Sequence, residues 1–89
     1  LILPCNHTSI TPTGYIHWYK LPPDQGPMLV IIGFKDMETD MFSMTFSKDR
    51  KSSYLHKKNI KLEDSGIYLC ALSDTVINTH QLTVQYVTT

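Results

Sequence analysis

The sequence predicts an all-β sandwich, because three observations agree. Short segments that favour strands alternate with turn-rich segments along the 89 residues. No stretch has the 3.6-residue apolar period of a helix. The third observation is Asp-Ser-Gly-Ile-Tyr-Leu-Cys at residues 64–70, where an acidic residue opens a tight turn and a strand follows. Tyr68 and Cys70 then share one face of that strand, since residues two apart point to the same side.

The strands can be placed in order from the N-terminus. Residues 1–7 alternate as a first strand, and residues 8–14 are rich in turn formers and are expected to be a loop. Residues 15–19 form the next strand, with Ile16 and Trp18 on one face and the residues between and after them on the other.

The middle of the chain continues the pattern. Residues 22–27 hold three prolines and a glycine and must turn. Residues 28–34 are a continuous apolar run, which is typical of a strand covered on both faces. Residues 35–40 are polar and are expected to be a loop, residues 41–47 alternate as a half-buried strand, and residues 48–51 form a charged, solvated bend.

The last third holds two further strand candidates. Residues 52–56 restart a strand, and residues 60–62 lead into the turn before Tyr68. Residues 81–87 have period-2 alternation and many β-branched residues, so they could form a final strand beside residues 68–72. We expect any such pairing to be weak and frayed.

Size and composition fit one small globular domain. The chain is 42% hydrophobic and 18% charged, and its formal net charge is +0. A neutral chain gives no electrostatic reason to bind nucleic acid or an anionic membrane. No apolar run reaches the length of a membrane span and no signal peptide is recognisable. Because the chain begins abruptly in an apolar run at Leu1, we expect it to be a fragment of a longer protein.

The two cysteines favour a disulfide. Cys5 and Cys70 lie 65 positions apart, too far for a Cys-x-x-Cys redox or zinc motif. A bridge closing a loop of that length would remove roughly 4 kcal/mol of denatured-state entropy, and would imply an oxidising compartment. The alternative is two buried thiols in a cytosolic protein. Asn6-His7-Thr8 is an N-glycosylation sequon and agrees with a secreted context.

Catalytic and metal-binding functions find no support in the residue pattern. The four histidines, His7, His17, His56 and His80, have no partner at ligand spacing and are expected to be surface or strand residues. No nucleophile elbow or glycine-rich oxyanion turn accompanies the serines. We therefore expect no enzyme, no metal and no cofactor.

A set of framework residues resembles a variable-type immunoglobulin domain. These residues are Cys5, Trp18, Leu55, Asp64, Tyr68 and Cys70. Finer segments resemble a T-cell receptor alpha-chain (or closely related delta-chain) variable domain over residues 1–74: Leu-Pro-Cys-Asn-His at 3–7, Tyr-Ile-His-Trp-Tyr at 15–19, Gln-Gly-Pro at 25–27 and Asp-Arg-Lys-Ser-Ser at 49–53.

The resemblance implies a fold and a location. It implies a two-sheet V-type sandwich that lacks the first strand, with Trp18 packed against a Cys5–Cys70 bridge. It also implies that the Tyr68 hydroxyl bonds to backbone just upstream. The domain would lie on the extracellular side of the plasma membrane.

The same resemblance implies partners and sites. Such domains pair with a beta-chain variable domain, bind peptide on a histocompatibility molecule, and reach signalling subunits through regions absent here. The pairing face would carry Tyr19, Leu21 and Pro27, and Asn6 would carry a glycan. The antigen-facing residues would come from residues 8–14, from residues 35–40 and from the segment after Cys70: Thr8, Ser9, Thr11, Thr13, Tyr15, Lys35, Asp36, Glu38, Leu72, Ser73 and Asp74.

Three side chains depart from the family pattern. Leu21 replaces a usual pairing-face Gln. Met41 stands where many variable domains carry an Arg that pairs with the corner Asp, so Asp64 should be left to backbone partners. Lys57 falls where an inward aliphatic residue is expected, and we expect it to snorkel or to lose its charge, weakening the core by about 1–3 kcal/mol.

The end of the chain departs too, because no Phe-Gly-x-Gly joining motif follows Cys70. We expect residues 75–89 to be a tail translated from DNA beyond an unrearranged germline segment. A non-rearranging cell-surface receptor or adhesion protein of variable type is the alternative, since it would lack that motif without rearrangement. A non-functional germline relic is the third possibility.

Overall fold

Eight strands and one 3₁₀ turn make up the described part of the chain. The computed structural model describes residues 1–8, 10–73 and 79–87, the last segment as backbone. In chain order the elements are β1 (Ile2–Asn6), β2 (Tyr15–Leu21), β3 (Met28–Gly33), β4 (Met37–Glu38), β5 (Phe42–Phe46), β6 (Ser52–Lys57), η1 (Leu62–Asp64), β7 (Gly66–Ser73) and β8 (Thr79–Val87).

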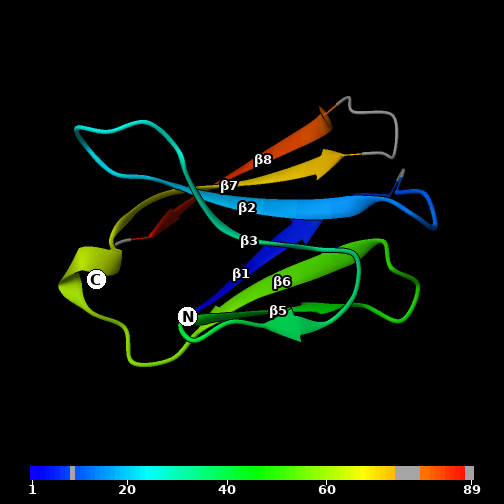
Figure 1. Ribbon diagram of the computed structural model, residues 1–89, viewed down its shortest axis with the longest axis horizontal. Helices are drawn as coiled ribbons and strands as arrows, with labels where there is room; N and C mark the ends of the chain where they lie inside the picture. Colours follow the sequence, from blue (N-terminus) through cyan, green and yellow to red (C-terminus); the bar gives the residue numbers. More distant parts are fainter. Residues whose placement is uncertain (9, 74–78, 88–89) are drawn as a thin grey trace.

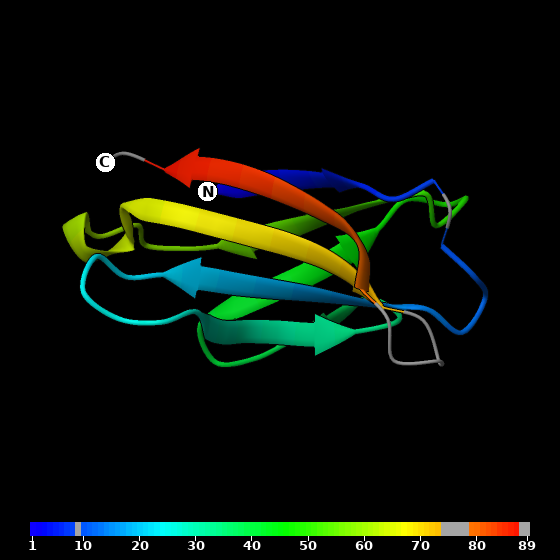
Figure 2. The same cartoon turned by 90° about the horizontal axis from the view of Figure 1, so that it is seen from above.

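The strands form two antiparallel sheets that face each other (Figure 1). One sheet has the order β1-β6-β5-β4 and the other the order β3-β2-β7-β8. Seen from above, the loop joining β1 to β2 and the turn joining β5 to β6 lie at one end, and η1 lies at the opposite end (Figure 2). We call these the loop end and the corner end. The predicted all-β sandwich of two antiparallel sheets is confirmed.

The core lies between the sheets and follows strand alternation. In β2, Ile16 and Trp18 are fully buried while His17 between them is not. Leu3 of β1 pairs with Leu55 of β6, and both side chains are buried. The remaining members of the buried cluster are Cys5, Ile31, Met44, Tyr68, Cys70 and Leu72.

Two segments differ from the sequence-based expectation. The apolar run at residues 28–34 is not covered on both faces, because β3 is an edge strand whose outward side chains are open to solvent. Residues 35–40, predicted to be a loop, contain the two-residue strand β4, which pairs with β5.

β8 extends the second sheet. Its backbone pairs with β7 from Gly66↔Val87 to Ser73↔Thr79, with one register shift between Leu72 and Ser73. The strand predicted at residues 81–87 therefore begins two residues earlier, at Thr79. The described part of the chain contains no helix that is long and apolar enough to cross a membrane.

Candidate functional site

The two sheets are joined at their centre by a disulfide. Cys5 of β1 and Cys70 of β7 are bonded, with their Cα atoms 6.3 Å apart. Trp18 lies directly opposite Cys70 in the β2–β7 ladder and is fully buried in the same cluster. The bridge therefore fixes the middle of the sandwich and leaves both ends to be held by other contacts.

The corner end is held by a buried hydrogen-bond network. The Tyr68 hydroxyl donates to the Asp64 carbonyl oxygen at 2.9 Å. Asp64 Oδ2 accepts from Lys57 Nζ at 2.9 Å and from the Lys61 backbone nitrogen at 2.8 Å. Burial alone would raise the pKa of the Asp64 carboxyl, but the hydrogen bonds from Lys57 and Lys61 lower it on balance.

This network corrects two expectations. Asp64 is not left to backbone partners, because Lys57 from β6 supplies the cation that Met41 cannot. Lys57 neither snorkels nor stands alone: its side chain is 4% exposed and reaches a buried carboxylate. A buried charge is tolerated when it is paired and hydrogen-bonded, which is the arrangement found here.

At the loop end, the first predicted loop offers several polar groups to solvent. Thr8 and Thr13 are exposed, Thr11 is half-buried, and Tyr15 is exposed at the start of β2. Ser9 lies outside the described residues. The Tyr15 ring meets the Phe34 ring edge-on, with centroids 5.6 Å apart, so this loop borders the segment that follows β3.

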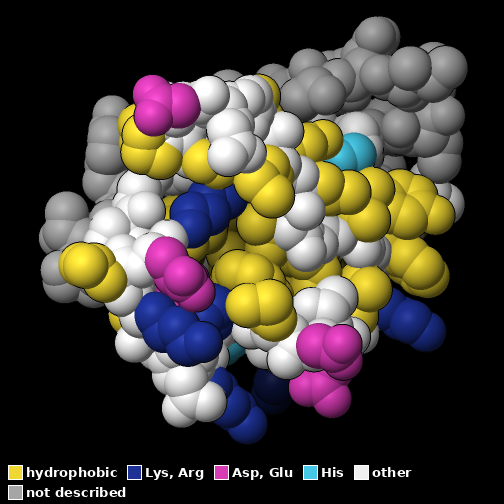
Figure 3. Space-filling model, turned by 60° about the vertical axis from the view of Figure 1, so that its left-hand side comes forward, with side chains coloured by type: hydrophobic (Ala, Val, Ile, Leu, Met, Phe, Trp, Pro, Cys, Tyr) yellow, Lys and Arg dark blue, Asp and Glu magenta, His cyan; other side chains and the backbone are white. Residues whose placement is uncertain are grey.

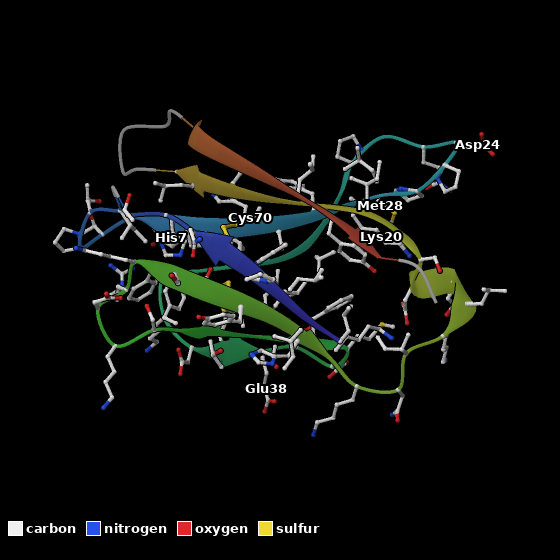
Figure 4. All side chains as sticks on the ribbon, turned by 180° about the vertical axis from the view of Figure 1, so that it is seen from behind. His7, Lys20, Asp24, Met28, Glu38 and Cys70 are labelled. Atoms are coloured by element: carbon white, nitrogen blue, oxygen red, sulfur yellow. A yellow bond between two sulfur atoms is a disulfide. The ribbon has the colours of Figure 1, made fainter. Side chains whose placement is uncertain are left out.

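Residues 35–40 do not form a single loop: the first two precede β4, and Glu38 lies within β4. Lys35 and Asp36 are exposed, but Asp36 Oδ1 accepts a hydrogen bond from the Phe46 backbone nitrogen at 2.8 Å. Glu38 belongs to β4 at the edge of the other sheet, and its side chain points away from the sandwich (Figure 4). The structure therefore does not bring Glu38 to the loop end.

Only part of the segment after Cys70 is exposed enough to contact a ligand. Leu72 is 4% exposed and belongs to the core, so it cannot contact a ligand at the surface. Its burial could have been foreseen, because residues two apart in a strand share a face and Cys70 points inward. Ser73 is half-buried and Asp74 lies outside the described residues.

One residue missed by the sequence reasoning lies between these loops. Arg50, assigned to a solvated bend, is half-buried and donates to backbone carbonyl oxygens on both sides of it. No local pattern signals this, because the partners are distant in sequence.

The outward face of the β3-β2-β7-β8 sheet is apolar on β3 and β2. On β3, Leu29 and Ile32 are 54% and 39% exposed. On β2, Tyr19 and Leu21 are half-buried on the same side, and Pro27 is exposed just before β3. We call this surface the apolar sheet face.

A histidine lies within the apolar sheet face. His17 stacks on Tyr19, and its ring nitrogens lie 3.2 Å from the Tyr19 hydroxyl and 2.5 Å from Ser73 Oγ. Burial lowers the pKa of the His17 imidazole. His17 therefore links the apolar sheet face to the loop end.

The apolar surface continues around the edge of the sandwich. Apolar side chains gather around a hollow in the space-filling view (Figure 3). A groove of about 540 Å³ opens there, where Met28 and Leu29 of β3 face Met41 and Phe42 across the gap between the sheets.

The other histidines also find defined places. His7, which is labelled in Figure 4, directly follows β1 and is fully buried, so the expectation that it lies at the surface is wrong. His56 Nε2 lies 2.8 Å from Thr45 Oγ1, and the His80 side chain is outside the described part. Among the described residues, no three His, Cys, Asp or Glu side chains could hold a metal ion together.

These features define a class of protein. An inter-sheet disulfide packed on a tryptophan, a tyrosine bonded to backbone at the turn before the second cysteine, and a β3-β2-β7-β8 sheet are the marks of a variable-type immunoglobulin domain.

The comparison with known proteins agrees with this class. The chain belongs to the immunoglobulin V-set domain family, whose model matches residues 1–87. That family is one of receptor domains and not of enzymes.

The curated relatives are T-cell receptor alpha variable chains, which confirms the resemblance found in the sequence. The chain is 42% identical over 69 residues to human T cell receptor alpha variable 26-1, covering 76% of this chain and 63% of that protein. It is 36% identical over 75 residues to rabbit T-cell receptor alpha chain V region RL-5 (81% and 55%) and 32% identical over 78 residues to human T cell receptor alpha variable 9-2 (82% and 67%). The chain thus spans between 55% and 67% of the length of these three relatives.

Proposed function

We propose that this chain is the antigen-recognition variable domain of a T-cell receptor alpha (or delta) chain. In this proposal the apolar sheet face pairs with a beta-type variable domain, and the loop end contributes to binding peptide on a histocompatibility molecule. The receptor would lie on the cell surface, have no catalytic activity, and reach signalling subunits through regions outside this chain. The alpha-chain relatives support the class of receptor.

The observation that carries the proposal is the apolar sheet face. Contiguous exposed apolar surface on a soluble domain marks an interaction site, and here it extends over the outward side of β2 and β3. The outward residues of the other sheet include Ser43, Thr45 and Ser52, which are polar. An edge strand as apolar as β3 would be expected to be shielded by a partner.

The pairing face is tested by introducing one charge. Leu21→Glu places a carboxylate within the proposed interface, so we expect association with a beta-type variable domain to fall at least tenfold, because an unpaired charge would be buried. Ser43→Glu, on the outward face of the other sheet, is the matched control. Analytical ultracentrifugation measures association, and circular dichroism checks that both variants fold. Equal association of the two variants would refute the assignment of this face.

The recognition loops would use polar, adaptable groups on a rigid sandwich. The described candidates at the loop end are Thr8, Thr11, Thr13, Tyr15, Lys35 and Asp36, with Ser73 at the end of β7. Glu38 and Leu72 are excluded from this set because of where their side chains lie.

A non-rearranging receptor of variable type is a second candidate, favoured by one observation. β8 completes the β3-β2-β7-β8 sheet and the family match runs to residue 87, although no Phe-Gly-x-Gly motif follows Cys70. Genomic DNA after the Asp74 codon separates the two candidates. A recombination heptamer, spacer and nonamer would support a germline segment with residues 75–89 as a tail, whereas splicing into a stalk or membrane exon would support the non-rearranging receptor.

A further inference from the structure

The turn between β5 and β6 holds one arginine in an unusual backbone conformation. Arg50 has φ of 59°, in the left-handed region that few non-glycine residues adopt. The turn around it is closed by hydrogen bonds: Ser47 Oγ and the Lys51 backbone nitrogen donate to Asp49 Oδ1, and the Arg50 nitrogen donates to the Ser47 carbonyl oxygen. The surrounding contacts therefore hold the backbone of Arg50 in place.

The guanidinium of Arg50 reaches the first candidate recognition loop and the residue that directly precedes the second. Its Nη1 donates to the carbonyl oxygens of Thr11 at 3.0 Å and Pro12 at 3.4 Å. Its Nη2 donates to the carbonyl oxygens of Gly14 at 3.2 Å and Phe34 at 2.9 Å. Three acceptors thus belong to the loop before β2, and the fourth belongs to the residue that follows β3.

The plane of the guanidinium is also supported from one side. Its carbon lies 5.3 Å from the centroid of the Phe46 ring, within the range of a cation–π contact. A planar fork with several fixed donors can bond to carbonyl groups on two segments at once, whereas a lysine ammonium is a single flexible point charge. The arrangement is therefore specific to arginine.

We propose that Arg50 is a positioning residue that joins the first two recognition loops into one preorganised surface. This role rests on the proposed function, because it concerns the loops that would meet the ligand. Ordering those loops in the free domain removes part of the entropy cost of binding. Arg50 acts through the backbone of the loops.

We call the bonding of the Arg50 guanidinium to these backbone carbonyl groups the clamp. Hydrogen exchange at two amides tests the clamp without any partner or ligand. The Gly14 nitrogen donates to the Thr11 carbonyl oxygen within the first loop, and the Phe46 nitrogen donates to Asp36 Oδ1 in the second. In Arg50→Lys, which keeps the charge but not the fork, we expect both amides to exchange at least tenfold faster by NMR on the 89-residue chain. Amides of the β2–β7 ladder around Trp18 and Cys70 should keep their wild-type rates. Lys48→Ala, in the same turn, is the matched control and should leave all of these rates unchanged.

Two results would overturn the proposal. Unchanged exchange at Gly14 and Phe46 in Arg50→Lys would show that the fork does not hold the loops, and equal acceleration across the β2–β7 ladder would show a general role in folding.

A measurement on the wild-type chain covers the case in which the variant does not fold. A clamped guanidinium gives separate, slowly exchanging Nη proton resonances, whereas one averaged resonance would contradict the clamp. Arg50→Lys should also associate with a beta-type variable domain as the wild type does. If the wild type itself fails to associate, the proposed function fails while the clamp is still measured.

Discussion

The two ends of the sandwich differ in whether their buried polar side chains form hydrogen bonds. At the corner end, the Asp64 carboxylate, the Lys57 ammonium and the Tyr68 hydroxyl are buried and bonded to one another or to backbone. At the loop end, His7 is fully buried, yet neither ring nitrogen has a hydrogen-bond partner among the described residues. Its ring meets Phe46 edge-on instead, with centroids 5.9 Å apart.

This difference indicates which contacts hold each end of the sandwich in place. The corner end depends on a closed network in which the loss of one member leaves a buried charge. The loop end tolerates an unsatisfied imidazole and depends on Arg50 bonding to backbone carbonyl groups. We therefore expect single substitutions at the corner end to change global stability most, and a change of pH between 7.5 and 5 to act through the loop end.

The largest effect is expected from breaking the corner ion pair. Lys57→Met leaves the Asp64 carboxylate buried without its cation, which typically costs about 3–5 kcal/mol. Because small domains are stable by only about 5–15 kcal/mol, the variant should unfold at a much lower urea concentration. Lys58→Met, at an exposed neighbouring position, is the control. Equal urea midpoints for the two variants would contradict the importance of the pair.

A double-variant cycle measures the coupling itself. Asp64→Asn should also be costly, since it leaves the Lys57 ammonium buried without a counter-ion. Combining Lys57→Met with Asp64→Asn removes both charges and keeps an acceptor for the Lys61 backbone nitrogen. We therefore expect the double variant to lose less free energy of unfolding than the sum of the single losses. Simple additivity would show that the two charges stabilise the fold independently.

A smaller effect is expected from acidification at the loop end. Burial lowers the pKa of the His7 imidazole, and the nearby Arg50 charge acts in the same direction, while the Asp49 charge opposes them. The unfolded chain then binds more protons than the folded one below a pH of about 6.5, so the free energy of unfolding falls as the pH drops. One group contributes a slope of at most about 1.4 kcal/mol per pH unit.

His7→Leu should flatten this dependence. Urea unfolding between pH 7.5 and pH 5 should show a smaller loss of stability in His7→Leu than in the wild type. Part of the slope should persist in that variant, because burial also lowers the pKa of His17. His17→Gln is the comparison variant, and it should keep the slope due to His7. Superimposable curves for the wild type and His7→Leu would rule out His7 as the pH-sensitive group.

The sequence contained enough to predict the framework, because strand alternation and the spacing of special residues are local. Ile16 and Trp18 point inward as their positions require, and Cys5 and Cys70 are bonded. The inward position of Lys57 was also predicted, since it follows Leu55 by two residues. Its partner was not, because Asp64 meets it only after the chain has turned through η1.

Other features depended on contacts that no local pattern records. An apolar run such as residues 28–34 has the same sequence pattern whether its second face is buried within the domain or exposed as a surface that binds a partner. Arg50 lies in a run of charges that is typical of a solvated bend, and its acceptors are 16 to 39 residues away. His7 was read as a surface or strand residue, although the alternation that places Cys5 inward also places His7 inward.

The smallest effect on stability is expected from substituting Asn6, the exposed first residue of the sequon at the loop end. Asn6, at the end of β1, and Thr8 are exposed, while His7 between them is buried. Ser52 Oγ donates to Asn6 Oδ1 at 3.0 Å, so the side-chain amide nitrogen, which would carry the sugar, is not the atom used in that bond. We therefore expect a glycan on Asn6 when the chain is secreted from animal cells. Glycosidase treatment should lower the mass by one glycan, and Thr8→Ala, which keeps Asn6 but breaks the sequon, should abolish that mass shift. In the unglycosylated chain, Asn6→Gln should change the free energy of unfolding by no more than about 0.5 kcal/mol. Secreted protein with an unmodified Asn6 would contradict the assignment, and a much larger loss of stability would mean that the Ser52 contact is a structural tie comparable to those of the corner end.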